Sequence, residues 1–160
     1  MKQTYKHALK QAMGLGAVAG LRATVAPAVA SNYLSKHPNT ALASSKLKFI
    51  QSPLTSIITK VLSAAEISGD KLPSAPNRIV LPQITARVAS GALVGATIFV
   101  ANRESLLKGA LIGGASALAA TFASFYARKY LDTLPHVQDA VVGAVEDSFA
   151  IGSGVKLIKS

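Results

Sequence analysis

The chain has 160 residues, of which half are apolar and only 15% are charged, compared with about 25% charged residues in ordinary soluble domains. This composition favours a membrane protein or a very apolar helical domain, and the absence of cysteine excludes disulfides, thiol catalysis and zinc–thiolate sites. The net charge of +10 does not indicate nucleic-acid binding, because the lysines and arginines fall in small groups between apolar stretches.

The first apolar stretch contains one arginine and one proline. A helix is expected over 5–20, with Gly16 and Gly20 as a small-xxx-small pair that permits close helix packing. Gly20, Arg22 and Pro27 weaken the helix beyond that point, because proline removes a backbone donor and clashes with the preceding turn. The sequence predicts a kinked or broken first helix: either a simple proline kink or a discontinuous helix whose freed backbone lines a site.

A second helix is predicted over 53–69, after a polar connection over 36–51. Its residues are largely Ile, Val, Leu and Ala. Polar side chains recur at spacings of four, three and four and make one stripe along it: Thr59, Ser63, Glu66 and Asp70.

Three further helices are predicted over 82–102, 105–131 and 136–158. The uncharged run over 109–127 would cover about 28 Å, close to the thickness of a bilayer core, so 105–131 is the clearest candidate span. Two of these helices carry small-xxx-small pairs, Gly91 with Gly95 and Gly109 with Gly113. The last helix is interrupted by two adjacent acids, Glu146 and Asp147.

The helices over 5–20 and 105–131 align without gaps, with Gly16 opposite Gly109 and Gly20 opposite Gly113. This alignment suggests an inverted repeat with halves over about 5–71 and 105–158 and a linking helix over 82–102. An odd number of intervening helices would make the second half cross the membrane in the opposite sense.

If five helices span the membrane, the lysines and arginines of the connections divide seven against seven. The positive-inside rule then assigns no orientation. Either the span count is wrong, or the protein has a weak or dual orientation.

An arginine in the middle of an apolar run is costly, by roughly 2.5–3.5 kcal/mol on insertion scales. We therefore expect Arg22 to lie near carboxylates from other helices, and the candidates are Glu66, Asp70, Glu146 and Asp147. These five residues form a structural ion-pair network, or a polar pathway in which Arg22 holds an anionic group or neutralises the acids, or they are charges that simply reach an interface. No histidine has a metal ligand at helical spacing, and no phosphate, dinucleotide or hydrolase motif occurs, so no metal, cofactor or enzyme activity is expected.

Several short motifs occur in a distinctive order: Gly20-Leu-Arg-Ala-Thr-Val-Ala-Pro27, Ser52-Pro53, Ala65-Glu66 with Gly69-Asp70-Lys71-Leu-Pro73, Pro76-Asn77-Arg78, Gly91-Ala-Leu-Val-Gly95, and Val145-Glu146-Asp147 with Ala150-Ile151-Gly152. In these motifs the chain resembles a bacterial integral-membrane family catalogued as domain of unknown function 4126. The resemblance implies a multi-pass protein of a bacterial inner membrane and implies no activity.

We expect an all-α polytopic membrane helix bundle of four to five spans, forming a single domain over 1–160. Its expected partners are membrane lipid and further copies of the same chain in a homo-oligomer, without nucleic acid. The leading hypothesis is a transporter- or channel-like protein with a buried Arg–carboxylate centre, acting on an ion or small polar solute. The alternatives are a membrane scaffold or assembly protein that binds partner helices through its small-xxx-small faces, and a soluble all-helical domain.

Overall fold

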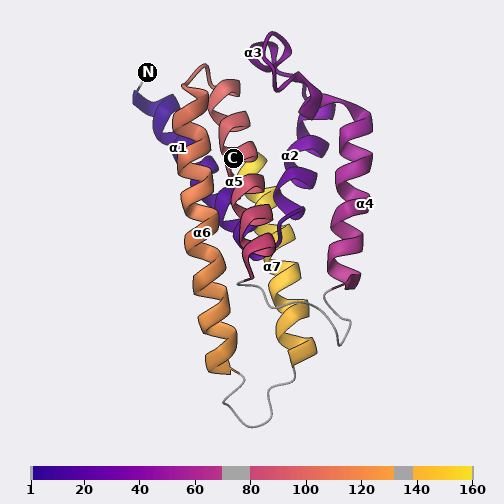
Figure 1. The fold of residues 1–160 in the computed structure, drawn as a ribbon. Helices are drawn as coiled ribbons and strands as arrows, with labels where there is room; N and C mark the ends of the chain where they lie inside the picture. The colour runs from indigo at the N-terminus through magenta and orange to yellow at the C-terminus, as the bar shows by residue number, and fades with distance from the viewer. Residues whose placement is uncertain (1, 70–79, 132–138, 160) are drawn as a thin grey trace.

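The computed structural model describes residues 2–69, 80–131 and 139–159, and every regular element in these ranges is helical (Figure 1). The elements in chain order are α1 (Lys2–Leu21), α2 (Val25–Lys36), α3 (Thr40–Ala43), the 3-10 helix η1 (Lys48–Gln51), α4 (Pro53–Gly69), α5 (Leu81–Ala101), α6 (Leu106–Leu131) and α7 (Asp139–Lys159). The five predicted helices are therefore confirmed to within a few residues, and the connection over 36–51 contains two short ones.

Helices α1 and α2 form a helical hairpin that reverses at residues 22–24 (Figure 1). Tyr5, near the start of α1, packs edge-on against Phe99 with ring centroids 5.9 Å apart. Asn39, just after α2, donates from Nδ2 to the carbonyl oxygen of Ala101 at 3.1 Å. Both ends of the hairpin therefore lie at the C-terminal end of α5.

The predicted break in the first helix is confirmed, but Pro27 is not the residue that makes it. Helix α1 ends at Leu21, and Pro27 is the third residue of α2. Proline costs little there, because first-turn amides have no carbonyl partner within their own helix. The simple proline kink is therefore wrong.

Helices α1, α5 and α6 pack closely at glycines. A Cβ atom added to Gly91 would lie 2.6 Å from the carbonyl oxygen of Gly113, and one added to Gly16 would lie 2.5 Å from the same oxygen. Similar backbone contacts are made by all the glycines predicted to pack helices: Gly16, Gly20, Gly91, Gly95, Gly109 and Gly113. Because these faces meet inside the chain, they are not available to a partner helix, which removes the basis of the scaffold alternative.

Helices α1 and α6, which the predicted inverted repeat aligns with each other, run in the same direction. The prediction that this pair is inverted is therefore wrong. Gly16 of α1 contacts Gly113 of α6, and Gly20 contacts Ala117 further along both helices. Inverted repeats require opposite directions. The physical reason is the reversal at residues 22–24. The first apolar stretch forms two antiparallel helices, α1 and α2, in place of one continuous helix, and this reverses the direction of every later helix relative to α1.

Helix α4 lies at the edge of the bundle, against α2 and η1 (Figure 1). Its polar stripe faces inward: Thr59 hydrogen-bonds Ser31 at 2.7 Å between hydroxyl oxygens, and Ser63 is buried. Its opposite face is apolar and 49–65% exposed, through Leu54, Ile57, Ile58, Val61 and Leu62.

In the described ranges, α5 and the part of α6 over Leu106–Tyr130 are long and apolar enough to cross a membrane. The buried core helix of a water-soluble protein passes the same test. Length and composition therefore identify two candidate spans among the described helices, fewer than the four to five that were predicted.

Candidate functional site: the tip of the helical hairpin

The residues that join α1 to α2 bring buried charges together. We call residues 20–24 the hairpin tip. Arg22 is 3% exposed and donates from Nε to Oδ1 of Asp147, on α7, at 2.6 Å. The helix break places this arginine in the interior, where its charge is compensated by an acid 125 positions away. Such short, charge-assisted contacts are among the stronger hydrogen bonds in proteins.

Glu66 of α4 caps the start of α2. Its carboxylate accepts hydrogen bonds from the backbone amides of Ala23 and Thr24, both at 2.9 Å, and from the hydroxyl of Thr24 at 2.5 Å. Thr24 occupies the N-cap position of α2 without using its own side chain as a cap. The amides freed by the break are thus satisfied by a carboxylate from another helix, at the electropositive end of α2.

The carbonyl groups freed at the end of α1 also have partners from other helices. Arg87 of α5, which is 1% exposed, donates from Nη1 to the carbonyl oxygen of Gly20 at 2.7 Å. The hydroxyl of Thr121 on α6 lies 3.1 Å from the same oxygen, and the hydroxyl of Ser90 donates to the carbonyl of Ala23. The tip is therefore held by α4, α5, α6 and α7 together.

The predicted acids take different places. Asp147 contacts Arg22, whereas Glu66 binds the tip backbone. Glu146 forms an ion pair with Arg128 of α6, with Oε2 and Nη2 2.6 Å apart. Asp70 lies outside the described residues. The two adjacent acids of α7 thus serve two arginines, because neighbouring helical residues point about 100° apart.

Sequence reasoning did not select Arg87, Thr121, Ser90 or Thr24 as site residues. A signal for Arg87 was present: it is a cation within an apolar helix, the same pattern that identified Arg22. The hydroxyl residues gave no comparable signal, because serine and threonine are common in apolar helices and their partners lie far away in the sequence.

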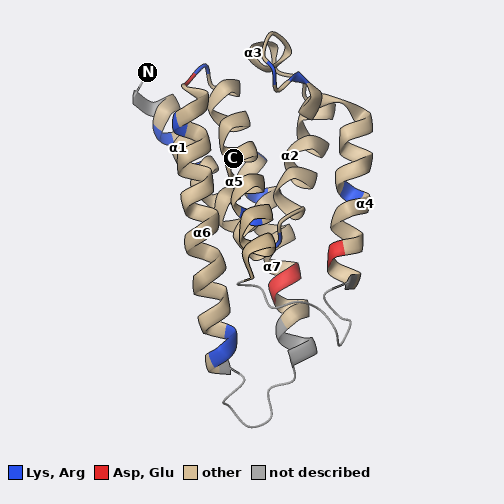
Figure 2. Cartoon of the chain, viewed as in Figure 1, with Lys and Arg blue, Asp and Glu red and all other residues tan. Residues whose placement is uncertain are grey.

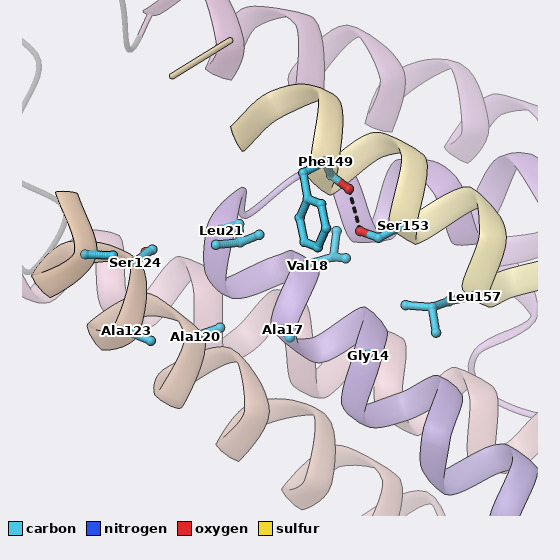
Figure 3. A pocket seen from close by; sticks show the side chains of 11 residues that line it. Gly14, Ala17, Val18, Leu21, Ala120, Ala123, Ser124, Phe149, Ser153 and Leu157 are labelled. Carbon is cyan, nitrogen blue, oxygen red and sulfur yellow. Dashed lines mark hydrogen bonds between the residues drawn. The ribbon is translucent and has the colours of Figure 1, made fainter. Parts of the chain in front are cut away.

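An apolar cavity of about 480 Å³, open to the surface, lies beside the tip, between α1, α6 and α7 (Figure 3). Small and apolar residues line it: Gly14, Ala17, Val18, Leu21, Ala120, Ala123, Ser124, Ala127, Phe149, Ser153 and Leu157. The ring of Phe149 and the side chains of Val18 and Leu21 border the same space (Figure 3). Leu21 directly precedes Arg22, so this apolar cavity lies next to the buried charges of the tip.

Within the described ranges, no three histidine, aspartate or glutamate residues are placed to hold a metal ion. The tip combines two buried arginines with two carboxylates and with backbone groups at two helix ends. The start of α2 is electropositive, so this arrangement favours a negatively charged group at the tip.

A family model described as "Domain of unknown function (DUF4126)" matches residues 9–159. The chain belongs to this family. The resemblance inferred from the short motifs is therefore confirmed over nearly the whole chain, and the family match includes the tip and its partners on α4 to α7. No curated protein and no solved structure matches the chain. The description of the family names no activity.

Proposed function

We propose that this family member is a multi-pass membrane protein whose hairpin tip is a transport or channel centre for a small anion. The membrane setting is supported by the distribution of side chains. Helix α4 turns its polar stripe inward and exposes its apolar face, and α6 and α7 also expose large apolar residues, among them Leu111, Tyr126 and Phe149. In water the hydrophobic effect opposes this arrangement, whereas hydrocarbon favours it.

The transport role is supported by one observation above all: the amides at the start of α2 hold a partly buried carboxylate from another helix. Broken helices whose ends point at charged groups within a membrane are characteristic of transporter binding sites. We propose that Glu66 is a tethered anion that occupies this site, and that a small external anion binds there when the Glu66 side chain moves away. Arg22 and Arg87 supply positive charge beside the path.

The cavity between α1, α6 and α7 gives the hairpin tip space to shift when Glu66 leaves it, since close-packed interiors otherwise resist displacement. It borders Leu21, the residue before Arg22. In this proposal the ion pair between Glu146 and Arg128 holds α7 against α6 and prevents the two helices from separating further beside the cavity.

The test is chloride flux into vesicles that contain the purified protein, measured for the unchanged chain and for Glu66→Gln. Glutamine keeps the shape of the side chain but replaces charge-assisted hydrogen bonds by neutral ones, a loss of about 1.4 kcal/mol in holding the tip. We therefore expect flux through Glu66→Gln to rise about tenfold.

The matched control is Glu104→Gln, which removes the same charge in the turn between α5 and α6. It should conduct like the unchanged protein. Flux no greater than in empty vesicles for both the unchanged protein and Glu66→Gln, with both chains folded by circular dichroism, would contradict the transport proposal.

A further inference from the structure

The hairpin changes which charges share an end of the molecule. If the first apolar stretch crossed a membrane, the N-terminal lysines and the connection over 36–51 would lie on opposite sides. Instead, Tyr5 and Asn39 both contact the C-terminal end of α5. Lys6 and Lys10 are therefore grouped with Lys36 at one end of the bundle.

Two other segments reach the same end. The turn after α5 leads into α6 there, and the last turns of α7 lie beside α1, where Gln11 donates to the carbonyl of Leu157 at 2.9 Å. Figure 2 shows basic residues at this end on α1, near α3 and in the turn between α5 and α6. We call it the cationic end, and its lysines and arginines are Lys2, Lys6, Lys10, Lys36, Lys46, Lys48, Arg103, Lys108, Lys156 and Lys159.

The opposite end carries fewer cations. Arg128 and Lys129 lie in the last turn of α6. Lys71 and Arg78 belong to the connection over 70–79, outside the described residues. Even if that connection is counted with the opposite end, the division of the terminal and connecting cations is ten against four, in place of the seven against seven expected from five crossings.

We infer that the cationic end lies on the cytoplasmic side of the membrane, against the anionic headgroups of that leaflet. The inference rests on the membrane setting in the proposed function and not on transport. Lysine and arginine in short connections determine orientation, and those near an anionic leaflet are attracted to its headgroups. An excess of six basic residues therefore favours one orientation strongly.

The spacing of charges on α6 is consistent with this placement. Lys108 and Arg128 are separated by twenty residues, or about 30 Å of helix, which matches a bilayer core. Thr121, the α6 contact of the hairpin tip, lies about 20 Å below Lys108 on the same scale. The hairpin thus enters from the cytoplasmic side, reaches about two-thirds of the way across and returns.

Orientation can be read with single cysteines, because the chain has none of its own. Lys46→Cys marks the cationic end and Lys129→Cys marks the opposite end; both native side chains are exposed. Each variant is produced as the full chain in bacterial cells, and intact spheroplasts are treated with a membrane-impermeant maleimide before and after lysis.

We expect Lys129→Cys to be labelled in intact spheroplasts and Lys46→Cys to be labelled only after lysis. The reverse pattern, or labelling of both variants before lysis, overturns the inference while leaving the proposed transport site untouched. Release of the protein into the supernatant by alkaline carbonate without detergent overturns the membrane setting as well. Absence of chloride flux in vesicles would overturn only the transport proposal.

Discussion

Arg22 shows how a costly residue is retained in an apolar interior. Its guanidinium is buried, and its contact with Asp147 spans almost the whole length of the chain. Breaking a buried ion pair by neutralising one partner leaves the other charge uncompensated, which costs about 3–5 kcal/mol. The pair therefore fixes the position of α7 relative to the hairpin tip.

We expect Asp147→Asn to lower the free energy of unfolding in detergent by about 3 kcal/mol or more, because the buried guanidinium of Arg22 loses the carboxylate that its Nε contacts. The double variant Arg22→Gln, Asp147→Asn should recover part of that loss, and a thermal or denaturant unfolding series of the four proteins measures the coupling. Strictly additive losses would show that the contact contributes nothing of its own. Glu104→Gln serves again as a control and should leave stability nearly unchanged.

For single residues, the sequence predicted that a buried charged centre exists, but it did not predict which groups contact Arg22. A lone arginine in an apolar stretch indicates that compensating groups must exist. Which acid binds Arg22 depends on how α7 is rotated about its own axis and on the reversal of the chain at the tip. The residues near Arg22 predict neither of these. Glu66 was selected for its charge, whereas its observed role depends on backbone amides that only the broken helix exposes.

Among the elements, α1, α5 and α6 form the closest-packed part of the bundle. Gly113 and Gly114 are neighbours on α6, but only Gly113 touches the backbone of both α1 and α5. An added methyl group at Gly113 would overlap the carbonyl of Gly91, whereas one at Gly114 would make ordinary contacts, 3.5 Å or more from Ala92 and Val88.

We therefore expect Gly113→Ala to destabilise the protein by about 1–3 kcal/mol through overpacking. Gly114→Ala, its matched control, should be neutral or stabilising by up to about 1 kcal/mol, because alanine favours helix. Unfolding in detergent measures both. Equal effects of the two substitutions would mean that these glycines do not hold the helices together.

The helices and their glycine pairs could be predicted because both are local patterns: apolar runs, terminating charges and small residues four apart. The direction after the break could not. Gly20 and Pro27 indicate that a helix is interrupted, but a kink and a full reversal differ only in what satisfies the freed backbone groups. Here Arg87, Ser90 and Glu66 do so, and they are contributed by two later helices.

For the whole molecule, this reversal has the largest consequence, because it decides which helix ends lie together and, in the proposed membrane setting, how many times the chain crosses. The sequence-based repeat and the balanced charge count both assumed that the first stretch crosses. Once it turns back, α1 and α6 run in the same direction and the basic residues gather at one end. The all-helical class and the single apolar bundle did not depend on that assumption, so they could be predicted from composition and periodicity.

The proposed bilayer around the bundle can be tested by the depth dependence of a charged substitution. Leu118 is ten residues from both Lys108 and Arg128 on α6 and is 40% exposed, whereas Leu111 is only three residues from Lys108 and is 66% exposed. In hydrocarbon, a lysine at the midpoint costs about 2.5–3.5 kcal/mol on insertion scales. A lysine at position 111 can extend its ammonium group toward the headgroups.

We therefore expect Leu118→Lys to reduce the amount of folded protein recovered from membranes, and Leu111→Lys to have little effect. Membrane fractionation followed by quantification of the monodisperse protein after detergent extraction measures both variants under the same expression conditions. In water the two exposed leucines would tolerate lysine equally well, because neither substitution would bury the new charge. A similar yield for both variants, with protein in the aqueous fraction, would therefore argue that water rather than hydrocarbon surrounds α6.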